Sequence, residues 1–143
     1  MLKRLLNKKH LVVLGLNSGT SADALDLAAV RIRRDGRRVT ARFLSGTTRR
    51  YPGELRAQIL EIADSSRIEL DRLILLHNSL GRFYGREAAR YIGKLESGGT
   101  KVDLVASHGQ TVRHLPEKTR LAGFAVGGSL QLGSPDRIAA ETG

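Results

Sequence analysis

The sequence has no cysteine and no tryptophan, and only 3 of its 143 residues are proline. Without cysteine, disulfides and thiolate metal sites are excluded. Aromatic residues make up 4% of the chain and do not alternate with its basic clusters, so the stacking platforms of single-strand nucleic-acid binders are missing. No apolar run approaches the roughly 20 residues that cross a bilayer. We therefore expect a cytoplasmic protein that uses no membrane.

Basic residues are in excess, with 24 lysines and arginines against 14 acidic residues and a net charge of +10. Such a charge attracts phosphorylated ligands, anionic membranes or nucleic acid. A basic nucleic-acid-binding protein is therefore an alternative function, although the charge alone supports it. Several of the basic residues form a basic amino-terminal tail at 1–10, and we interpret another group as a solvent-facing patch: Arg31, Arg33, Arg34, Arg37, Arg38 and Arg42.

The first third of the chain predicts three strands. The apolar run at Leu11–Leu16 ends in polar residues, and two further strand-like segments flank Asp35-Gly36. Asp-Gly between such segments indicates a hairpin, because glycine accepts the positive φ that the turn requires. The expected strands are Leu11–Leu16, Leu25–Arg33 and Arg38–Thr47.

We assign residues 11–143 to a single domain. After the three strands, its sequence predicts helices and further strands. One helix follows Pro52, and a longer one, with Asp71 as its cap, runs to Gly98-Gly99. Gly81 and Gly85 lie one turn apart on it and predict a close approach to a neighbouring backbone, and His77 lies on its packed face. The remaining expected elements are a strand at Val102–Ala106, a strand at Ser129–Leu132 and a helix at Pro135–Glu141 capped by Ser134. This order predicts an α/β fold whose mixed sheet has three antiparallel strands first and parallel strands later.

Residues 17–26 read NSGTSADALD and offer glycine, hydroxyl groups and carboxylates within one loop. Gly19 permits close backbone approach to a phosphate, and Asp23 or Asp26 could hold a magnesium ion through water. No Walker lysine motif is present. The same composition is also common in a simple turn between two strands, so both interpretations stay open at this point. The hydroxyl groups in residues 17–26 that could donate to phosphate oxygens are those of Ser18, Thr20 and Ser21.

Three separated segments resemble the anhydro-N-acetylmuramic acid kinase family, in the family's order and spacing. Residues 15–26 (GLNSGTSADALD) are similar to the family's opening signature, residues 107–114 (SHGQTVRH) with Pro116 to its His-Gly-Gln-Thr segment, and residues 129–143 to its Leu-Gln-Ile-Gly block and following helix. Together they extend from Leu11 to Gly143.

The resemblance implies a ribonuclease-H-like lobe of the actin and sugar-kinase type, in which two lobes clasp ATP. It implies ATP and Mg as cofactors, with Asp23 and Asp26 near the metal. The family phosphorylates the 6-oxygen of 1,6-anhydro-N-acetylmuramic acid and opens its anhydro bridge with water, which recycles cell-wall sugar. The substrate side would include His108, Gln110 and Thr111, although His108 could equally fix its loop. The implied phosphate loop is Gly19, Thr20, Ser21, Ala22, Asp23, Ala24, Leu25 and Asp26.

Two departures from the family qualify that expectation. Ala24 replaces a glycine that the family uses in the loop, which would strain a position with positive φ. The chain also lacks the family's second lobe and its catalytic base, and neither Asp103 nor Asp136 is assigned in its place. We therefore expect an inactive half enzyme, partnered by a separate carboxy-terminal lobe or by a second copy in a homodimer. A noncatalytic oligomerising or nucleotide-sensing module is the other alternative.

Overall fold

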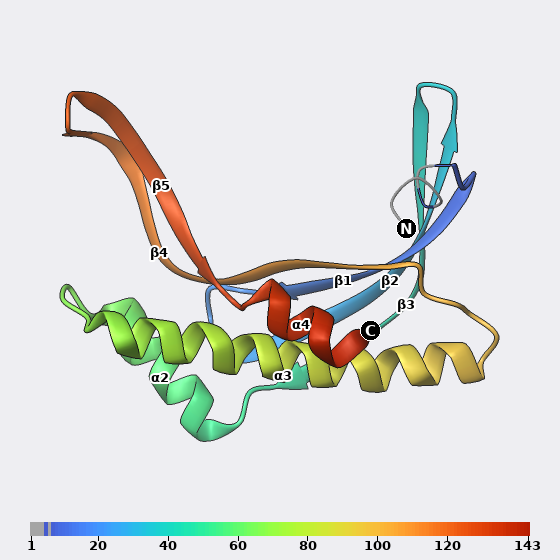
Figure 1. The fold of residues 1–143 in the computed structure, drawn as a ribbon, viewed down its shortest axis with the longest axis horizontal. Helices are drawn as coiled ribbons and strands as arrows, with labels where there is room; N and C mark the ends of the chain where they lie inside the picture. Colours follow the sequence, from blue (N-terminus) through green and yellow to red (C-terminus); the bar gives the residue numbers. More distant parts are fainter. Residues whose placement is uncertain (1–4, 6) are drawn as a thin grey trace.

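The computed structural model describes Leu5 and residues 7–143, and in this part of the chain five strands form one sheet with three helices on one of its faces (Figure 1). His10, at the end of the predicted tail, already belongs to the first strand, and residues 1–4 and 6 of that tail lie outside the described residues. The strands are β1 (His10–Ser18), β2 (Ala24–Asp35), β3 (Arg38–Arg50), β4 (Leu104–Leu121) and β5 (Phe124–Leu132), and the helices are α2 (Gly53–Asp64), α3 (Leu70–Ser97) and α4 (Pro135–Thr142).

The strand order in the sheet is β3-β2-β1-β4-β5. The antiparallel pairing of β1, β2 and β3 and the parallel pairing of β4 with β1 confirm the prediction. The prediction of parallel later strands is wrong for β5, which pairs antiparallel with β4. Only Ala122 and Gly123 separate these two strands. A parallel connection needs a dozen residues or more, so this short turn permits only the antiparallel arrangement.

β4 is much longer than the predicted strand at Val102–Ala106. It begins at Leu104 and continues to Leu121, so His108, Gln110 and Thr111 lie within the strand and not in a loop after its end. Pro116 is accommodated at a register shift between Leu115 and Thr119. Proline is tolerated at such irregularities because it has no amide hydrogen to give to the ladder.

The outer parts of two hairpins extend from the sheet as arms, on the side opposite the helices (Figure 1). In the β2–β3 arm Asp35 still pairs with Arg38, so the turn is Gly36-Arg37 and Gly36 takes the positive φ of 57°. In the β4–β5 arm, Ala122 and Gly123 have φ of 50° and 87°. The two hairpins, β2–β3 and β4–β5, expose large apolar side chains, namely Val39, Phe43, Leu115, Leu121, Phe124, Val126 and Leu130.

The core lies between the sheet and the helices. Alternate residues of β1 and β2 are buried there, including Leu14 and Leu25, and they pack with Leu80 and Tyr84 of α3. The long amphipathic helix ends before Gly98 and Gly99, as predicted. Its predicted cap was wrong, because the helix starts at Leu70 with Glu69 as N-cap.

α3 and α4 approach closely through glycines, which confirms the prediction for Gly81 and Gly85. A Cβ at Gly81 would lie 2.6 Å from the carbonyl oxygen of Ser134, and one at Gly85 would lie 2.7 Å from Cβ of Glu141. Ser134 caps α4 as predicted, because its side chain accepts a hydrogen bond from the Arg137 amide at 3.4 Å. His77, predicted on the packed face of the helix, is half-buried, and its Nδ1 accepts a hydrogen bond from the Gly133 amide at 3.2 Å.

Candidate functional site

The β1–β2 connection presents the predicted polar loop at the surface. Gly19, Thr20 and Ser21 are exposed, whereas Ala22 is 2% exposed and anchors the loop in the core. The Ala22 amide donates to the Gly19 carbonyl at 3.2 Å, and Ala22 has a φ of 50°. The loop therefore has a fixed turn. Of its three predicted hydroxyl donors, Ser18 is buried and donates to Gln110 and Ser21 donates to Asp23, so within the described residues the exposed Thr20 hydroxyl is the one without a hydrogen bond.

Ala24 does not carry the strain that its replacement of glycine predicted. It is the first residue of β2, and the left-handed residue of the turn is Ala22, two positions earlier. Because the chain has already entered the strand at Ala24, an alanine there needs no unusual backbone conformation. Strain at Ala24 was expected only for a positive φ, and that condition is not met.

Asp23 and Asp26 are both exposed and differ in their partners. The Ser21 hydroxyl donates to the Asp23 carboxylate at 2.7 Å, and this bond is the main reason that the pKa of Asp23 lies below its ordinary value. Asp26 accepts from the Thr48 hydroxyl at 2.6 Å. Both carboxylates have further lone pairs for a cation.

No group of three His, Cys, Asp or Glu side chains converges anywhere in Leu5 and residues 7–143. Magnesium needs no such group, because it commonly binds one or two carboxylates and takes its other ligands from phosphates and water. Asp23 and Asp26 each offer an exposed carboxylate of the kind that magnesium binds.

A depression on the face of the sheet opposite the helices brings two parts of the predicted site together. It has a volume of about 450 Å³, and Asp26 and His108 both line it. Asn17, which pairs directly with Asp26 across β1 and β2, contributes an exposed amide. The small residues Gly15, Ala28 and Ala106 lie in the same lining. A metal candidate and a substrate candidate thus share one surface.

Of the three residues assigned to the substrate side, only His108 is exposed. Thr111 is half-buried, and Gln110 is fully buried. Gly109 between them has a φ of 78°, and its Cα lies so close to β5 that an added Cβ would be 2.7 Å from the Leu132 carbonyl oxygen. This glycine allows the chain to turn His108 outward and Gln110 inward.

Behind the loop, four polar side chains meet in the core. The Tyr51 hydroxyl lies 2.7 Å from that of Tyr84 and donates to Ser18 Oγ at 2.9 Å. Ser18 Oγ donates to Gln110 Oε1 at 2.5 Å. Sequence analysis missed Tyr51 and Tyr84 as part of the site, because no motif contains them and only the fold brings them to Ser18.

Asp103 is unsuited to act as a catalytic base. Its carboxylate accepts from the Val12 amide at 2.9 Å and pairs with the Lys8 ammonium. Burial tends to raise the pKa of Asp103, but the bonds from Lys8 and Val12 outweigh it and leave the pKa below the ordinary value. This carboxylate holds the amino-terminal segment against the start of β4.

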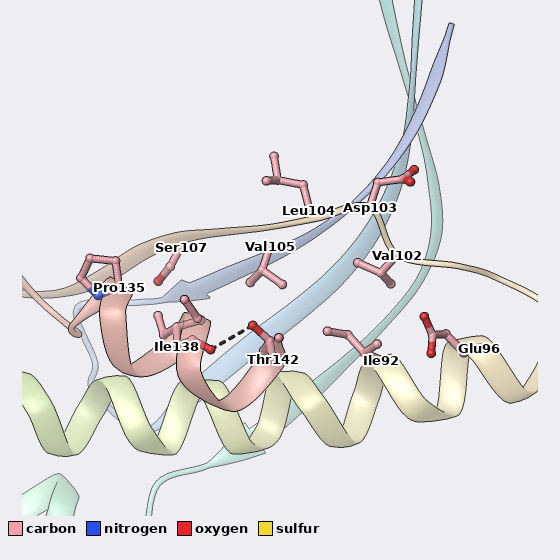
Figure 2. Close-up of a pocket in the computed structure, with 12 residues that line it drawn as sticks. Ile92, Glu96, Val102, Asp103, Leu104, Val105, Ser107, Pro135, Ile138 and Thr142 are labelled. Atoms are coloured by element: carbon pink, nitrogen blue, oxygen red, sulfur yellow. Dashed lines mark hydrogen bonds between the residues drawn. The ribbon is translucent and has the colours of Figure 1, made fainter. Parts of the chain in front are cut away.

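A second groove of about 450 Å³ lies between α3, β4 and α4. Figure 2 shows Val105 and Ile138 pointing into it, whereas Leu104 points to the other side of the strand. From Leu104 to Gly109, β4 pairs with β1 only, because its pairing with β5 starts at Gln110. This edge of the sheet is therefore open beside an apolar groove.

Comparison with known proteins decides the family. The family model described as anhydro-N-acetylmuramic acid kinase matches residues 11–143. The chain belongs to the anhydro-N-acetylmuramic acid kinase family. None of the helices in the described residues combines the length and apolarity that a membrane crossing requires.

Relatives named anhydro-N-acetylmuramic acid kinase occur in several bacteria. The protein of Caldanaerobacter subterraneus subsp. tengcongensis is 32% identical over 142 residues, which is 99% of this chain and 36% of the relative. That of Rhodococcus erythropolis is 38% identical over 131 residues, which is 92% of this chain and 31% of the relative. This anhydro-N-acetylmuramic acid kinase family member thus spans about a third of the length of the curated relatives it matches.

Among solved structures, CasPhi-2 (Cas12j) bound to crRNA and phosphorothioate DNA matches 98% of this chain and 23% of its own, with 11% sequence identity. The TM-score is 0.26, which is too low to support an inference about fold or function.

Proposed function

We propose that this chain is the phosphate-binding amino-terminal lobe of an anhydro-N-acetylmuramic acid kinase, with the ribonuclease-H-like arrangement of sugar kinases. The observation that carries the proposal is the loop at residues 19–23, which exposes Gly19, Thr20 and Ser21 beside an ionised Asp23. Backbone amides and hydroxyl groups in such a turn bind phosphate oxygens. In the proposed kinase this loop would hold the phosphates of ATP, and the protein would act in the cytoplasm.

Phosphoryl transfer depends mainly on positioning and on neutralising charge. In the proposed reaction the γ-phosphoryl group of ATP passes to the 6-oxygen of 1,6-anhydro-N-acetylmuramic acid, the bond between that oxygen and C1 breaks, and water adds to C1. The products are ADP and N-acetylmuramic acid 6-phosphate. Magnesium would supply charge neutralisation at the phosphates. The chain's own part is to fix the phosphates with the loop amides and to hold the cation beside Asp23 and Asp26.

The sugar is proposed to lie on the open face of the sheet, where His108 and Asp26 line one depression. An exposed imidazole and carboxylate suit the hydroxyl groups of a sugar, because both can form hydrogen bonds with them. No side chain of this chain is assigned as the base that activates water. That group belongs to the second lobe in the proposed enzyme.

We further propose that a second polypeptide completes the enzyme, either a separate carboxy-terminal lobe or a second copy of this chain. The open edge of β4 at Leu104–Gly109 supports the proposal, since unpaired strand edges tend to acquire a partner strand. The neighbouring groove offers apolar side chains, including Val105 and Ile138, for that partner to cover.

Titration calorimetry with magnesium and a nonhydrolysable ATP analogue tests the loop. The chain should bind saturably, and Asp23→Ala should abolish this binding. Asp35→Ala is the matched control, because it removes the same charge from an exposed position in the β2–β3 arm. Absence of binding at millimolar nucleotide, or equal loss in both variants, would contradict the proposed loop.

Complementation tests the enzyme as a whole. The carboxy-terminal two-thirds of the Rhodococcus erythropolis relative would be mixed with this chain, the anhydro sugar and ATP. Release of the phosphorylated sugar only from the mixture would support a half enzyme. Nucleotide binding without turnover in any mixture would instead favour the noncatalytic nucleotide-sensing module.

A further inference from the structure

Gln110 is 0% exposed, and every polar atom of its side chain has a partner. Its Nε2 donates to the Gly19 carbonyl at 3.2 Å and to the Thr111 carbonyl at 3.1 Å. Its Oε1 accepts from Ser18 Oγ at 2.5 Å. Because an amide nitrogen has two hydrogens to donate, both are used inside the protein, and none remains for a ligand.

These bonds connect two separate segments of the site. Ser18 ends β1 and Gly19 begins the phosphate loop, while Gln110 belongs to the part of β4 that carries His108. The two carbonyl partners fix the orientation of the amide, since the nitrogen must face them. One side chain thus sets the distance between the loop and the strand that lines the depression.

The hydroxyl groups behind Gln110 are linked through Ser18. Tyr51 donates to Ser18 Oγ at 2.9 Å, which leaves Tyr84 to donate to Tyr51, and Ser18 Oγ has two acceptors, Gln110 Oε1 at 2.5 Å and the Ala24 carbonyl at 3.1 Å. Burial, the largest cause in each case, raises the pKa of Tyr51 and of Tyr84, which keeps both phenols protonated and able to donate. Bonds in such a chain polarise and strengthen one another.

We propose that Gln110 is a positioning residue, which locks the phosphate loop to β4 and touches neither nucleotide nor sugar. The inference rests on the proposed function, since that function makes the loop a phosphate-binding loop. The hydrogen bonds that couple the loop to β4 are present without any ligand. In this proposal His108 contacts the sugar, and Gln110 holds the phosphate loop in a fixed position relative to β4.

Hydrogen exchange of the chain without nucleotide tests the coupling. In Gln110→Leu, which keeps the size of the side chain and removes its polar atoms, the amides of residues 19–24 should exchange about tenfold faster than in the wild type, as expected from the loss of one or two hydrogen bonds. Val112→Ala is the matched control, because Val112 is also buried in β4 but has no part in the network. Equal acceleration of loop exchange in both variants, at equal loss of global stability, would overturn the proposal.

Tyr51→Phe provides a milder variant if Gln110→Leu fails to fold. It removes one donor from Ser18 and should accelerate exchange of the same loop amides by a smaller factor, whereas an unchanged loop would count against the network. Calorimetry with the ATP analogue then separates the two proposals. If the wild type binds no nucleotide, the proposed function fails, while faster loop exchange in Gln110→Leu still supports the coupling.

Discussion

The two faces of the sheet carry side chains of very different size, although these residues alternate along the same strands. Toward the helices, Leu14, Leu16 and Leu27 are almost fully buried. On the opposite face, Gly15 of β1 and Ala28 of β2, which alternate with these leucines along the strands, line a depression. The covered face gains its stability from packing. The open face has no helix packed on it and carries the depression.

The proposed site lies where the covered face of the sheet meets the open face. Ala22 anchors the loop in the covered core, while its neighbours Ser21 and Asp23 remain exposed. This arrangement suits phosphate binding. The buried anchor keeps the loop rigid, so the loop loses little entropy on binding, and the exposed polar groups can contact the phosphate. The covered face should therefore resist substitution, whereas the open face should tolerate it.

The largest effect is expected at the contact between α3 and α4. Gly81→Ala places a methyl group 2.6 Å from the Ser134 carbonyl oxygen and should lower the free energy of unfolding by about 2 kcal/mol or more. Gly93→Ala is the control, because it lies in the same helix with nothing within 4 Å and should stabilise by up to about 1 kcal/mol. Urea denaturation measures both. Similar effects at the two glycines would disprove the close contact.

Tyr84→Phe should have an intermediate effect. It removes the hydroxyl that donates to Tyr51 and leaves the packing of the ring in place. The expected loss is about 1 kcal/mol of unfolding free energy, a typical value for one hydrogen bond. Urea denaturation again provides the measurement. An unchanged midpoint would show that the Tyr84 hydroxyl contributes nothing to the core network.

Stability should also fall in alkali because of the same tyrosines. Burial raises the pKa of Tyr51 above 10.0, so at a pH above this value the unfolded chain loses the phenolic proton while the folded chain keeps it. The free energy of unfolding therefore decreases as pH rises above about 10. Denaturation of the wild type and of a Tyr51→Phe, Tyr84→Phe double variant at several alkaline pH values measures the difference. Parallel curves would refute the assigned shift.

The smallest effect is expected on the open face. A Cβ at Gly15 would lie 3.7 Å from the Ala28 carbonyl oxygen, an ordinary contact. Gly15→Ala should therefore be neutral or stabilise by about 0.5 kcal/mol, because alanine loses less conformational entropy in a strand. Thermal denaturation of Gly15→Ala and Gly81→Ala measured side by side compares the effects of the two substitutions on stability. A destabilisation as large as that of Gly81→Ala would show that this face is covered after all.

Much of the body of the fold was predictable because burial leaves a pattern in the sequence. The β2–β3 hairpin, α3 with its glycines and the Ser134 cap each follow from local signals. The arms were not predictable to their full length, since Leu115 and Phe124 are exposed and no buried face imposes an alternation there.

The residue types of the candidate loop suit phosphate but also suit a simple turn, so the proposed role came from the family resemblance, and nothing in the sequence indicated the side chains that support the loop. Tyr51, Tyr84 and Gln110 are far apart in the chain and share no motif, and only the packing of α3 against the sheet brings them to Ser18. For the same reason nothing in the sequence indicated that Gln110 points inward while His108 faces solvent.

The end of the β4–β5 arm has a practical consequence. Ala122 and Gly123 form a turn outside the body of the fold, and nothing lies within 4 Å of the place where a Cβ on Gly123 would be. Exposed tips of this kind accept inserted sequence without loss of the core. A peptide epitope or a small fluorescent reporter placed between these two residues would leave both chain ends free, so that assembly with a second polypeptide could be followed in living cells.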